Sequence, residues 1–335
     1  MTSQRLKMTL AEKSPRASLL HHAMRRIVRS TAPAGDRARL CVLVYHRVRS
    51  SGDKLDTWNP TAEEFEAQMA LLSACFEPLP LTEAVERLQS RSLPRGAVAV
   101  TFDDGYADNY EVALPILQRL RVPATFFIST GYLDGGRMWN DTVVEAVRAT
   151  DAPTLDLSVL GMGAFPLATD EQRRAAIFSI LAELKYLPAR EREARAAGLE
   201  AMARVALPGN LMLVSEQVRA LHDAGMEVGA HTVTHPILAQ LDGADARREI
   251  HESRDHLRSI LGIPVTLFAY PNGKPGRDYL AEHVQMVRDA GFRAALSTAP
   301  GAATTAADSL QLPRISPWQR TPGRFGLALT RSLWS

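Results

Sequence analysis

The sequence has few cysteines, no long apolar run and no strong net charge. Its 335 residues contain only two cysteines, Cys41 and Cys75, which is too few for a disulfide framework and does not require an oxidising compartment. No segment approaches the roughly 18 apolar residues that a membrane span needs, and the N-terminus lacks the apolar core of a secretory signal. A net charge of +2 argues against a polyanion-binding surface over the whole molecule. These absences predict a cytoplasmic globular protein, with membrane association as the alternative.

The basic charge is concentrated at the N-terminus. Residues 1–39 hold nine Lys or Arg and only two acidic residues. Within residues 16–30, apolar side chains form one helical stripe with arginines beside it, which predicts a basic amphipathic helix in peripheral contact with a membrane. A helix packed on its own protein, or a tail, gives the same pattern. The segment has no interleaved aromatics, so no nucleic-acid partner is expected, and nothing in the sequence indicates an oligomeric state.

After this segment, short apolar runs alternate with helical patterns. About seven runs predict strands, and the helix after the first run begins with a capping box at Thr61. Such alternation is typical of a parallel sheet covered by helices, and seven strands suit an imperfect barrel better than a flat sheet. The predicted organisation is a basic tail or amphipathic helix over 1–39, a barrel over 40–320 with a helical insertion at about 135–210, and a C-terminal tail over 321–335. Insertions of this kind often shape the substrate cleft.

Two adjacent acids follow the apolar run AVAVTF. Asp103 and Asp104 therefore lie at the carboxyl end of a predicted strand, which is the catalytic face of α/β folds. Because neighbouring side chains of an extended chain point to opposite sides, one carboxylate can bind a metal while the other handles a proton. The tripeptide DDG alone, however, is usually a solvated turn.

A second motif, HTVTHP, follows another predicted strand. His231 and His235 are separated by three residues, and these β-branched residues, with Pro236 after them, argue against a regular helix. A tight turn can bring the two imidazoles together. Two histidines and one carboxylate form a three-ligand site with room for water, as in catalytic zinc centres. HxxxH alone is a modest signal, but in combination with the paired acids it becomes strong.

TFDDG and HTVTH, in this order and spacing, resemble the motifs of the NodB-homology polysaccharide deacetylases, carbohydrate esterase family 4. The resemblance runs from about residue 40 to about residue 318, and the stretches FAYPNG and YHRV resemble a variant subgroup that modifies bacterial exopolysaccharides. It implies an α/β fold that is a distorted (β/α)7 barrel. It also implies a divalent metal, with zinc as the expected ion, and an N-acetylated carbohydrate as the substrate.

The resemblance also assigns roles to matching residues. Asp104, His231 and His235 match the metal ligands, and Asp103 matches the general base that takes a proton from water. FAYPNG matches the motif that supplies a backbone N–H to the tetrahedral oxyanion, which places this donor at the amide of Asn272.

The sequence departs from the family pattern at two places. The base-orienting arginine of the family falls at Ala269, so we predict that Arg314, in the last strand, replaces it; an exposed salt bridge is the alternative. The usual C-terminal general acid is missing, because no histidine follows His283. We predict that His46 in YHRV is the acid, as in a subgroup that resembles poly-N-acetylglucosamine deacetylases, since a closed barrel puts its first strand beside its last. The alternative is a structural histidine.

Aromatic side chains near these motifs are candidates for sugar contact, because aromatic rings stack on the apolar faces of sugars. The candidates are Tyr106, Trp139, Tyr270 and Trp318; a buried or interface position is the alternative. The leading prediction is a metal-dependent hydrolase that removes N-acetyl groups from amino sugars of a polysaccharide or its precursor. A deformylase or deacetylase of a lipid-linked sugar and a non-catalytic carbohydrate-binding relative are the alternatives.

Overall fold

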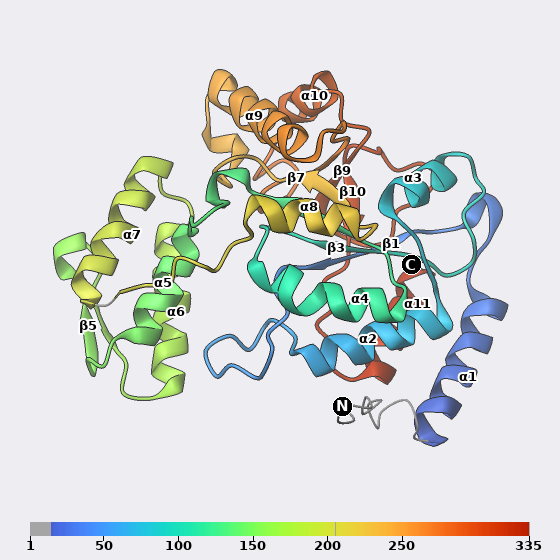
Figure 1. The fold of residues 1–335 in the computed structure, drawn as a ribbon, viewed down its shortest axis with the longest axis horizontal. Helices are drawn as coiled ribbons and strands as arrows, with labels where there is room; N and C mark the ends of the chain where they lie inside the picture. Colours follow the sequence, from blue (N-terminus) through green and yellow to red (C-terminus); the bar gives the residue numbers. More distant parts are fainter. Residues whose placement is uncertain (1–14, 205, 335) are drawn as a thin grey trace, which may run out of the picture.

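A parallel, nearly closed barrel forms the centre of the computed structural model, which describes residues 15–204 and 206–334 (Figure 1). Its strands, in spatial order, are β1 (Cys41–Tyr45), β3 (Ala97–Phe102), β4 (Ala124–Ile128), β7 (Glu227–Ala230), β8 (Leu267–Ala269), β9 (Ala294–Pro300) and β10 (Leu312–Arg314). The short β2 (Glu77–Pro78) pairs with β3. Ile315 closes the barrel, because its amide donates to Val42 O at 2.8 Å and its carbonyl accepts from Val44 N at 3.1 Å. The predicted distorted barrel is confirmed.

Helices cover the outside of the barrel. They are α2 (Ala62–Cys75), α3 (Leu81–Gln89), α4 (Leu114–Leu120), α8 (Ser215–Asp223), α9 (Gly243–Leu261) and α10 (Ala281–Asp289). The predicted capping box at the start of α2 is present: Thr61 accepts from the Glu64 amide, and the Glu64 carboxylate accepts from the Thr61 amide. A π-helical turn, Asn109–Ala113, precedes α4. Short 3₁₀ turns lie at Gly35–Arg37, Thr130–Tyr132, Ser158–Leu160 and Leu238–Gln240.

The barrel strands are buried on both faces, which explains their continuous apolar runs. All residues of β1, β3 and β4 are buried. Aromatic side chains form part of the core: the rings of Phe102 and Phe126 stack with centroids 4.8 Å apart, and Tyr45 stacks on Phe102 at 5.5 Å. This packing gives rigid support to the loops at the strand ends.

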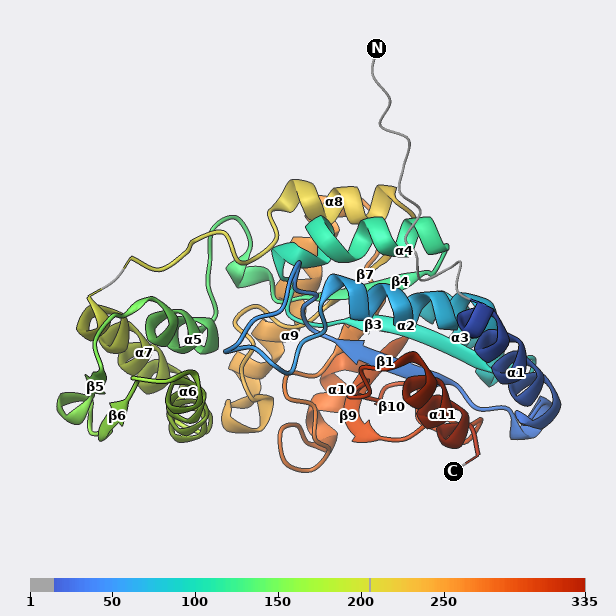
Figure 2. The same cartoon turned by 90° about the horizontal axis from the view of Figure 1, so that it is seen from below.

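The two ends of the described chain pack together, on the side of the barrel opposite the insertion (Figures 1 and 2). In α1 (Pro15–Thr31), Met24 and Val28 are buried in the main core, whereas Ile27 is 45% exposed. The residues expected as a C-terminal tail instead form α11 (Pro322–Ser332), which buries Phe325 and Leu329. At Met24 and Val28, α1 therefore packs on its own protein, and membrane contact of this segment stays a prediction. Within the described ranges, no helix is both long and apolar enough to cross a bilayer.

The insertion is a small lobe with its own apolar core, beside the barrel (Figure 2). It comprises α5 (Trp139–Ala149), β5 (Thr154–Asp156), β6 (Ala164–Pro166), α6 (Asp170–Leu184) and α7 (Ala189–Ala203). Its helices were expected, but the antiparallel β5–β6 hairpin was not. Fully buried Val143, Ile177 and Leu199 show that the lobe is packed independently of the barrel core.

Candidate active site

Asp103 and Asp104 follow β3 and turn to different partners. The Asp103 amide donates to Tyr45 O at 2.9 Å, which continues the pairing of β3 with β1. Asp104 has a φ of +76°, a left-handed conformation that side chains other than glycine rarely adopt, and Gly105 follows at +89°. This turn leaves Asp103 at the strand end and directs Asp104 toward the two histidines.

Asp103 is held by Arg314 from β10. The guanidinium donates from Nη1 to Oδ1 at 2.7 Å and from Nη2 to Oδ2 at 2.6 Å, and its Nε donates to Ser297 O at 2.9 Å. The two side chains are 0% and 4% exposed, so this is not a rim salt bridge. Burial acts to raise the pKa of Asp103, but the facing guanidinium outweighs it and holds that pKa below its ordinary value. Arg314 thus keeps the carboxylate ionised and fixes both of its oxygens.

Asp104, His231 and His235 converge. Asp104 Oδ1 lies 3.5 Å from His231 Nε2 and 3.4 Å from His235 Nε2, and the three potential ligand atoms all lie within 4.8 Å of one another. Asp104 Oδ1 is buried and has no hydrogen-bond partner among residues 15–204 and 206–334. This orphaned oxygen between two imidazole nitrogens fits a bound divalent cation.

The electrostatics of Asp104 and His235 agree with a role as metal ligands. Burial would raise the pKa of Asp104, but the two imidazoles outweigh it and keep the pKa low. Burial, reinforced by His231, lowers the pKa of His235 to about 3, so its imidazole is neutral and keeps a lone pair for a metal. For His231, burial acts to lower the pKa, but Asp103 and Asp104 outweigh it and raise the value.

A backbone carbonyl orients the imidazole ring of His231. Its Nδ1 lies 2.7 Å from Ala269 O. A carbonyl oxygen can only accept, so Nδ1 must carry the hydrogen, and Nε2 presents its lone pair to the space beside Asp104. Histidine ligands of metals are commonly fixed in this way by a carbonyl or carboxylate on the other ring nitrogen.

Glu249 of α9 holds the turn that carries the two histidines. Its carboxylate accepts from the Val233 amide at 2.7 Å, the Thr234 amide at 2.8 Å and the Thr234 hydroxyl at 2.7 Å. The turn needs such support, because Thr232 and His235 have φ values of +64° and +53°. Sequence reasoning missed Glu249, since the pattern of α9 does not show which of its acids faces this turn.

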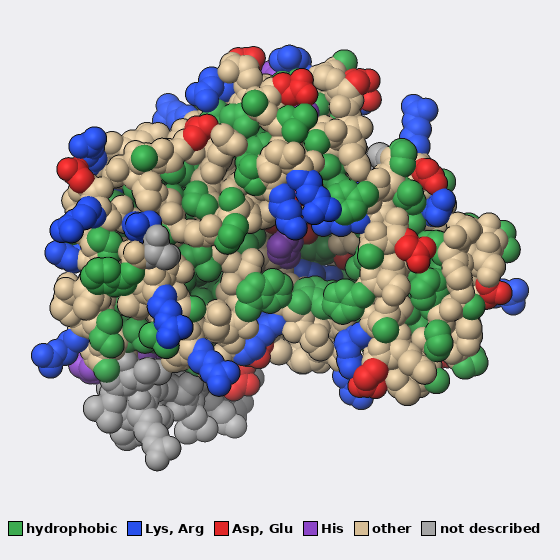
Figure 3. Space-filling view, turned by 180° about the vertical axis from the view of Figure 1, so that it is seen from behind, with side chains coloured by type: hydrophobic (Ala, Val, Ile, Leu, Met, Phe, Trp, Pro, Cys, Tyr) green, Lys and Arg blue, Asp and Glu red, His purple; other side chains and the backbone are tan. Residues whose placement is uncertain are grey.

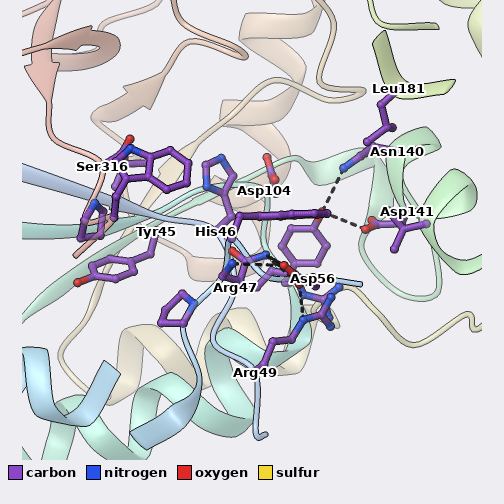
Figure 4. A pocket seen from close by; sticks show the side chains of 18 of the residues that line it. Tyr45, His46, Arg47, Arg49, Asp56, Asp104, Asn140, Asp141, Leu181 and Ser316 are labelled. Carbon is purple, nitrogen blue, oxygen red and sulfur yellow. Dashed lines mark hydrogen bonds and ion pairs between the residues drawn. The ribbon is translucent and has the colours of Figure 1, made fainter. Parts of the chain in front are cut away.

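A cavity of about 520 Å³ lies between the barrel and the insertion. Figure 3 shows a hollow there, with a histidine side chain visible inside it. His46, directly after β1, is exposed to the cavity, and Figure 4 shows it and Asp104 bordering the same space. Asn109 donates to His46 O at 2.9 Å and so fixes the backbone of His46. The position of His46 therefore allows it to reach a ligand.

Two of the four aromatic candidates line the cavity. Tyr106 is buried in its wall, and Trp318 is 67% exposed at its edge. Trp139 is instead partly buried against the insertion core, with the Arg192 guanidinium 5.2 Å from its ring centroid. Tyr270 is fully buried and stacks on a neighbouring tyrosine with centroids 3.8 Å apart. These two are not among the cavity-lining residues, because position after a strand or before a helix does not reveal which way a side chain turns.

Asn272 has the left-handed φ of +59° expected in a tight turn, and its carbonyl accepts from Thr298 Oγ1 at 2.6 Å. Within the described chain, no hydrogen bond or ion pair joins it to Asp104 or to the two histidines. Its amide as oxyanion donor stays a prediction.

The insertion supplies cavity residues that sequence reasoning missed. Asn140 and Asp141, directly after Trp139, line the cavity together with Phe178 of α6. Burial raises the pKa of Asp141 to about 7; the charge of Arg47 opposes this shift. Trp58, from the loop after β1, packs its ring 5.4 Å from that of Phe178. Trp139 was the residue predicted to contact sugar in this turn, but the residues that line the cavity are the polar pair directly after it.

A parallel barrel with an Arg-held carboxylate beside an Asp–His–His cluster, all at the carboxyl ends of strands, is the arrangement of a hydrolase. The polysaccharide deacetylase family model matches residues 90–295. The chain therefore belongs to the polysaccharide deacetylase family and is an enzyme of that type.

Individual proteins show the same relationship. The putative polysaccharide deacetylase YxkH of Bacillus subtilis is 22% identical over 293 residues, covering 87% of this chain and 75% of that protein. The poly-beta-1,6-N-acetyl-D-glucosamine N-deacetylase of Staphylococcus aureus is 33% identical over 104 residues, covering 27% of this chain and only 36% of that protein.

Solved structures share the fold. The Streptococcus pyogenes deacetylase PplD in complex with acetate superposes with a TM-score of 0.58 at 20% identity, over 88% of this chain and 98% of PplD. IcaB from Ammonifex degensii superposes with a TM-score of 0.56 at 20% identity, over 88% of this chain and 97% of IcaB.

Proposed function

We propose that this chain is a metal-dependent hydrolase that removes N-acetyl groups from amino sugars of a polysaccharide, with polymers of N-acetylglucosamine as the substrate class. The convergence of Asp104, His231 and His235 beside the Arg314-held Asp103 carries the proposal. The partial match to a poly-beta-1,6-N-acetyl-D-glucosamine N-deacetylase supports the choice of polymer.

The cluster provides two imidazole nitrogens and one carboxylate oxygen, the donor set of catalytic zinc sites. Asp104, His231 and His235 would hold the ion, and zinc is the expected choice. When bound, such an ion would supply Lewis-acid chemistry, polarising an acetyl carbonyl and lowering the pKa of a water molecule.

The remaining steps belong to the side chains. Asp103 takes the proton of the attacking water; its oxygens still have free lone pairs while Arg314 binds them, because each carboxylate oxygen accepts more than one hydrogen bond. The Asn272 amide stabilises the tetrahedral oxyanion. His46 gives a proton to the departing amine, which would otherwise be a poor leaving group. Tyr106 and Trp318 contact the sugar from the cavity wall.

A lipid-linked sugar is the second candidate substrate. The apolar wall of the cavity, to which Val144, Phe178 and Leu181 of the insertion contribute, favours it. Competition between a chito-oligosaccharide and a polyprenyl-phosphate sugar separates the two candidates. Stronger inhibition by the polyprenyl-linked compound would favour the lipid-linked substrate.

The first test is the metal content of the purified protein by elemental analysis, for wild type and for His235→Ala. We expect about one equivalent of a divalent ion in the wild type, in line with a three-ligand site, and its loss together with acetate release in the variant. His256→Ala, which changes an exposed histidine of α9, is the matched control and should keep both. Wild-type protein without metal after reconstitution would instead support a non-catalytic carbohydrate-binding relative.

A further inference from the structure

The first turn of α5 presents two polar side chains to the cavity (Figure 4). Both touch the hydroxyl of Tyr106: Asp141 Oδ1 lies 3.1 Å from it and Asn140 Nδ2 lies 3.4 Å from it. Neither residue has a part in the hydrolytic steps proposed above, so their position at the cavity calls for a different explanation.

The hydrogen-bond pattern fixes the direction of both side chains. A tyrosine hydroxyl has one hydrogen, and an ionised carboxylate can only accept, so with Asp141 ionised Tyr106 donates to Asp141 and accepts from Asn140. The other oxygens, Asn140 Oδ1 and Asp141 Oδ2, are buried and without a hydrogen-bond partner in the described ranges. Asp141 as a whole is only 5% exposed. A buried acceptor without a hydrogen-bond donor costs free energy, which indicates that a ligand supplies donors to these two oxygens.

The two neighbouring arginines are hydrogen-bonded to other carboxylates and not to the free oxygen of Asp141. Arg47 lies over the Tyr106 ring, with its guanidinium carbon 4.3 Å from the centroid, and donates to Asp108 at 2.7 Å. Arg49 donates to Asp56 at 2.6 Å. Among the described ion pairs none involves Asp141, so its free oxygen is open to a donor from a molecule that enters the cavity.

We propose that Asn140 and Asp141 form a subsite that binds an N–H or O–H donor of the glycan and so selects the sugar unit beside the Asp104 cluster. The inference rests on the proposed function. Both side chains line the cavity, so a small adjustment of χ2, a broad torsion in Asp and Asn, would bring a free oxygen within reach of a ligand there. Donors of this chemistry have two sources: the hydroxyls of every sugar unit, and the ammonium that N-deacetylation itself leaves on a neighbouring unit.

The test uses Asp141→Asn, which keeps the shape of the side chain but replaces one acceptor with an NH₂ donor. Calorimetry on the full chain would measure its affinity for two tetrasaccharides of N-acetylglucosamine, one fully acetylated and one with a single free amine. We expect binding to weaken about tenfold, as for a lost hydrogen bond to a charged group. An equal loss for both sugars identifies a hydroxyl, and a loss confined to the amine-bearing sugar identifies the ammonium.

Asp151→Asn removes the same charge from an exposed position of the insertion and is the matched control. Asn140→Ala is a second variant and should weaken binding in the same direction. Metal content, which reports an intact site, should stay at the wild-type value in all three proteins. Unchanged affinity in both subsite variants, an equal loss in the control, or a wild type that binds neither sugar would overturn the subsite.

Acetate release from the same sugars separates this inference from the proposed function. Turnover by the wild type without any effect of Asp141→Asn on affinity would refute the subsite and leave the function standing. Weaker binding by the variant, in a protein that releases no acetate from either sugar, would refute the function and leave the subsite standing.

Discussion

The cavity has two walls of different origin. The barrel wall consists of strand ends and the tight turns after them; it presents Asp104 and His46 to the cavity, with the two histidines and the Arg314-held Asp103 next to Asp104 along the chain or in space. The insertion wall consists of helices with a separate apolar core, and it presents Asn140, Asp141 and apolar side chains. The chemistry is thus placed on the rigid part of the fold, and contacts that can select a substrate are placed on a lobe that can vary without disturbing it.

Backbone strain is concentrated on the barrel wall. The described residues include eight non-glycine positions with positive φ, and half of them belong to the turns of the site: Asp104, Thr232, His235 and Asn272. Strained conformations of this kind persist only where neighbouring structure imposes them. Changes on the barrel wall should therefore affect catalysis and metal binding strongly, whereas changes on the insertion wall should affect substrate binding.

Asp103→Asn should have the largest effect. Loss of the general base should lower kcat by about 10²–10⁴-fold, while the Asp104 cluster keeps its metal. The measurement is acetate release, combined with elemental analysis of the variant. Full activity in this variant would remove Asp103 as the base, and loss of the metal would show that Asp103 also supports the ligands.

His46→Ala should discriminate between two kinds of acetyl substrate. An amine needs a proton to leave, whereas a phenolate leaves without one, so deacetylation of the sugar should fall about 10²-fold and hydrolysis of 4-nitrophenyl acetate much less. Both rates would be measured on the same preparation. Equal losses for the two substrates would argue that His46 has a structural role instead.

Glu249→Gln should weaken metal binding without removing a ligand. The glutamine keeps one acceptor but loses the second oxygen and the charge that hold the Val233 and Thr234 amides. Outer-shell changes of this kind cost about 10–100-fold in metal affinity, which titration with a competing chelator would measure. Glu252→Gln, on the exposed face of the same helix, is the control and should behave as wild type. Equal affinities in both variants would show that the turn keeps its shape without Glu249.

The sequence signals were strong where local chemistry decides the structure. The run AVAVTF predicted a strand over 97–102, and β3 has these bounds, because a strand buried on both faces must be apolar throughout. Asp104 and the two histidines could be grouped because each motif directly follows such a strand. The helix α11 was missed, since PGRFGLALT contains two glycines and its helix depends on tertiary packing.

The remaining site residues depend on packing that no local pattern encodes. Glu249 reaches the histidine turn from a helix whose other acids face solvent, and Asp141 reaches the cavity because the insertion lies beside the barrel. Tyr270 follows β8 as directly as Asp103 follows β3, yet it turns into the core. The sequence thus predicted where the strands end. It did not predict which side chains from other helices and loops lie at those strand ends.

Trp318 and Trp139 allow a direct comparison between an exposed ring at the cavity and a ring packed on the insertion, and the expected effects on activity are the smallest. Trp318 lines the cavity and is 67% exposed, so Trp318→Ala should raise KM for the polysaccharide a few-fold, since stacking of one exposed ring contributes only about 1 kcal/mol. Trp139 is partly buried against the insertion core, so Trp139→Ala should instead destabilise the protein, by less than the roughly 3–5 kcal/mol of a fully buried ring. Steady-state kinetics and thermal unfolding of both variants would measure the two effects. A rise in KM for Trp139→Ala at unchanged stability would place Trp139 at the sugar after all, whereas unchanged KM in Trp318→Ala would remove the exposed ring from the substrate path.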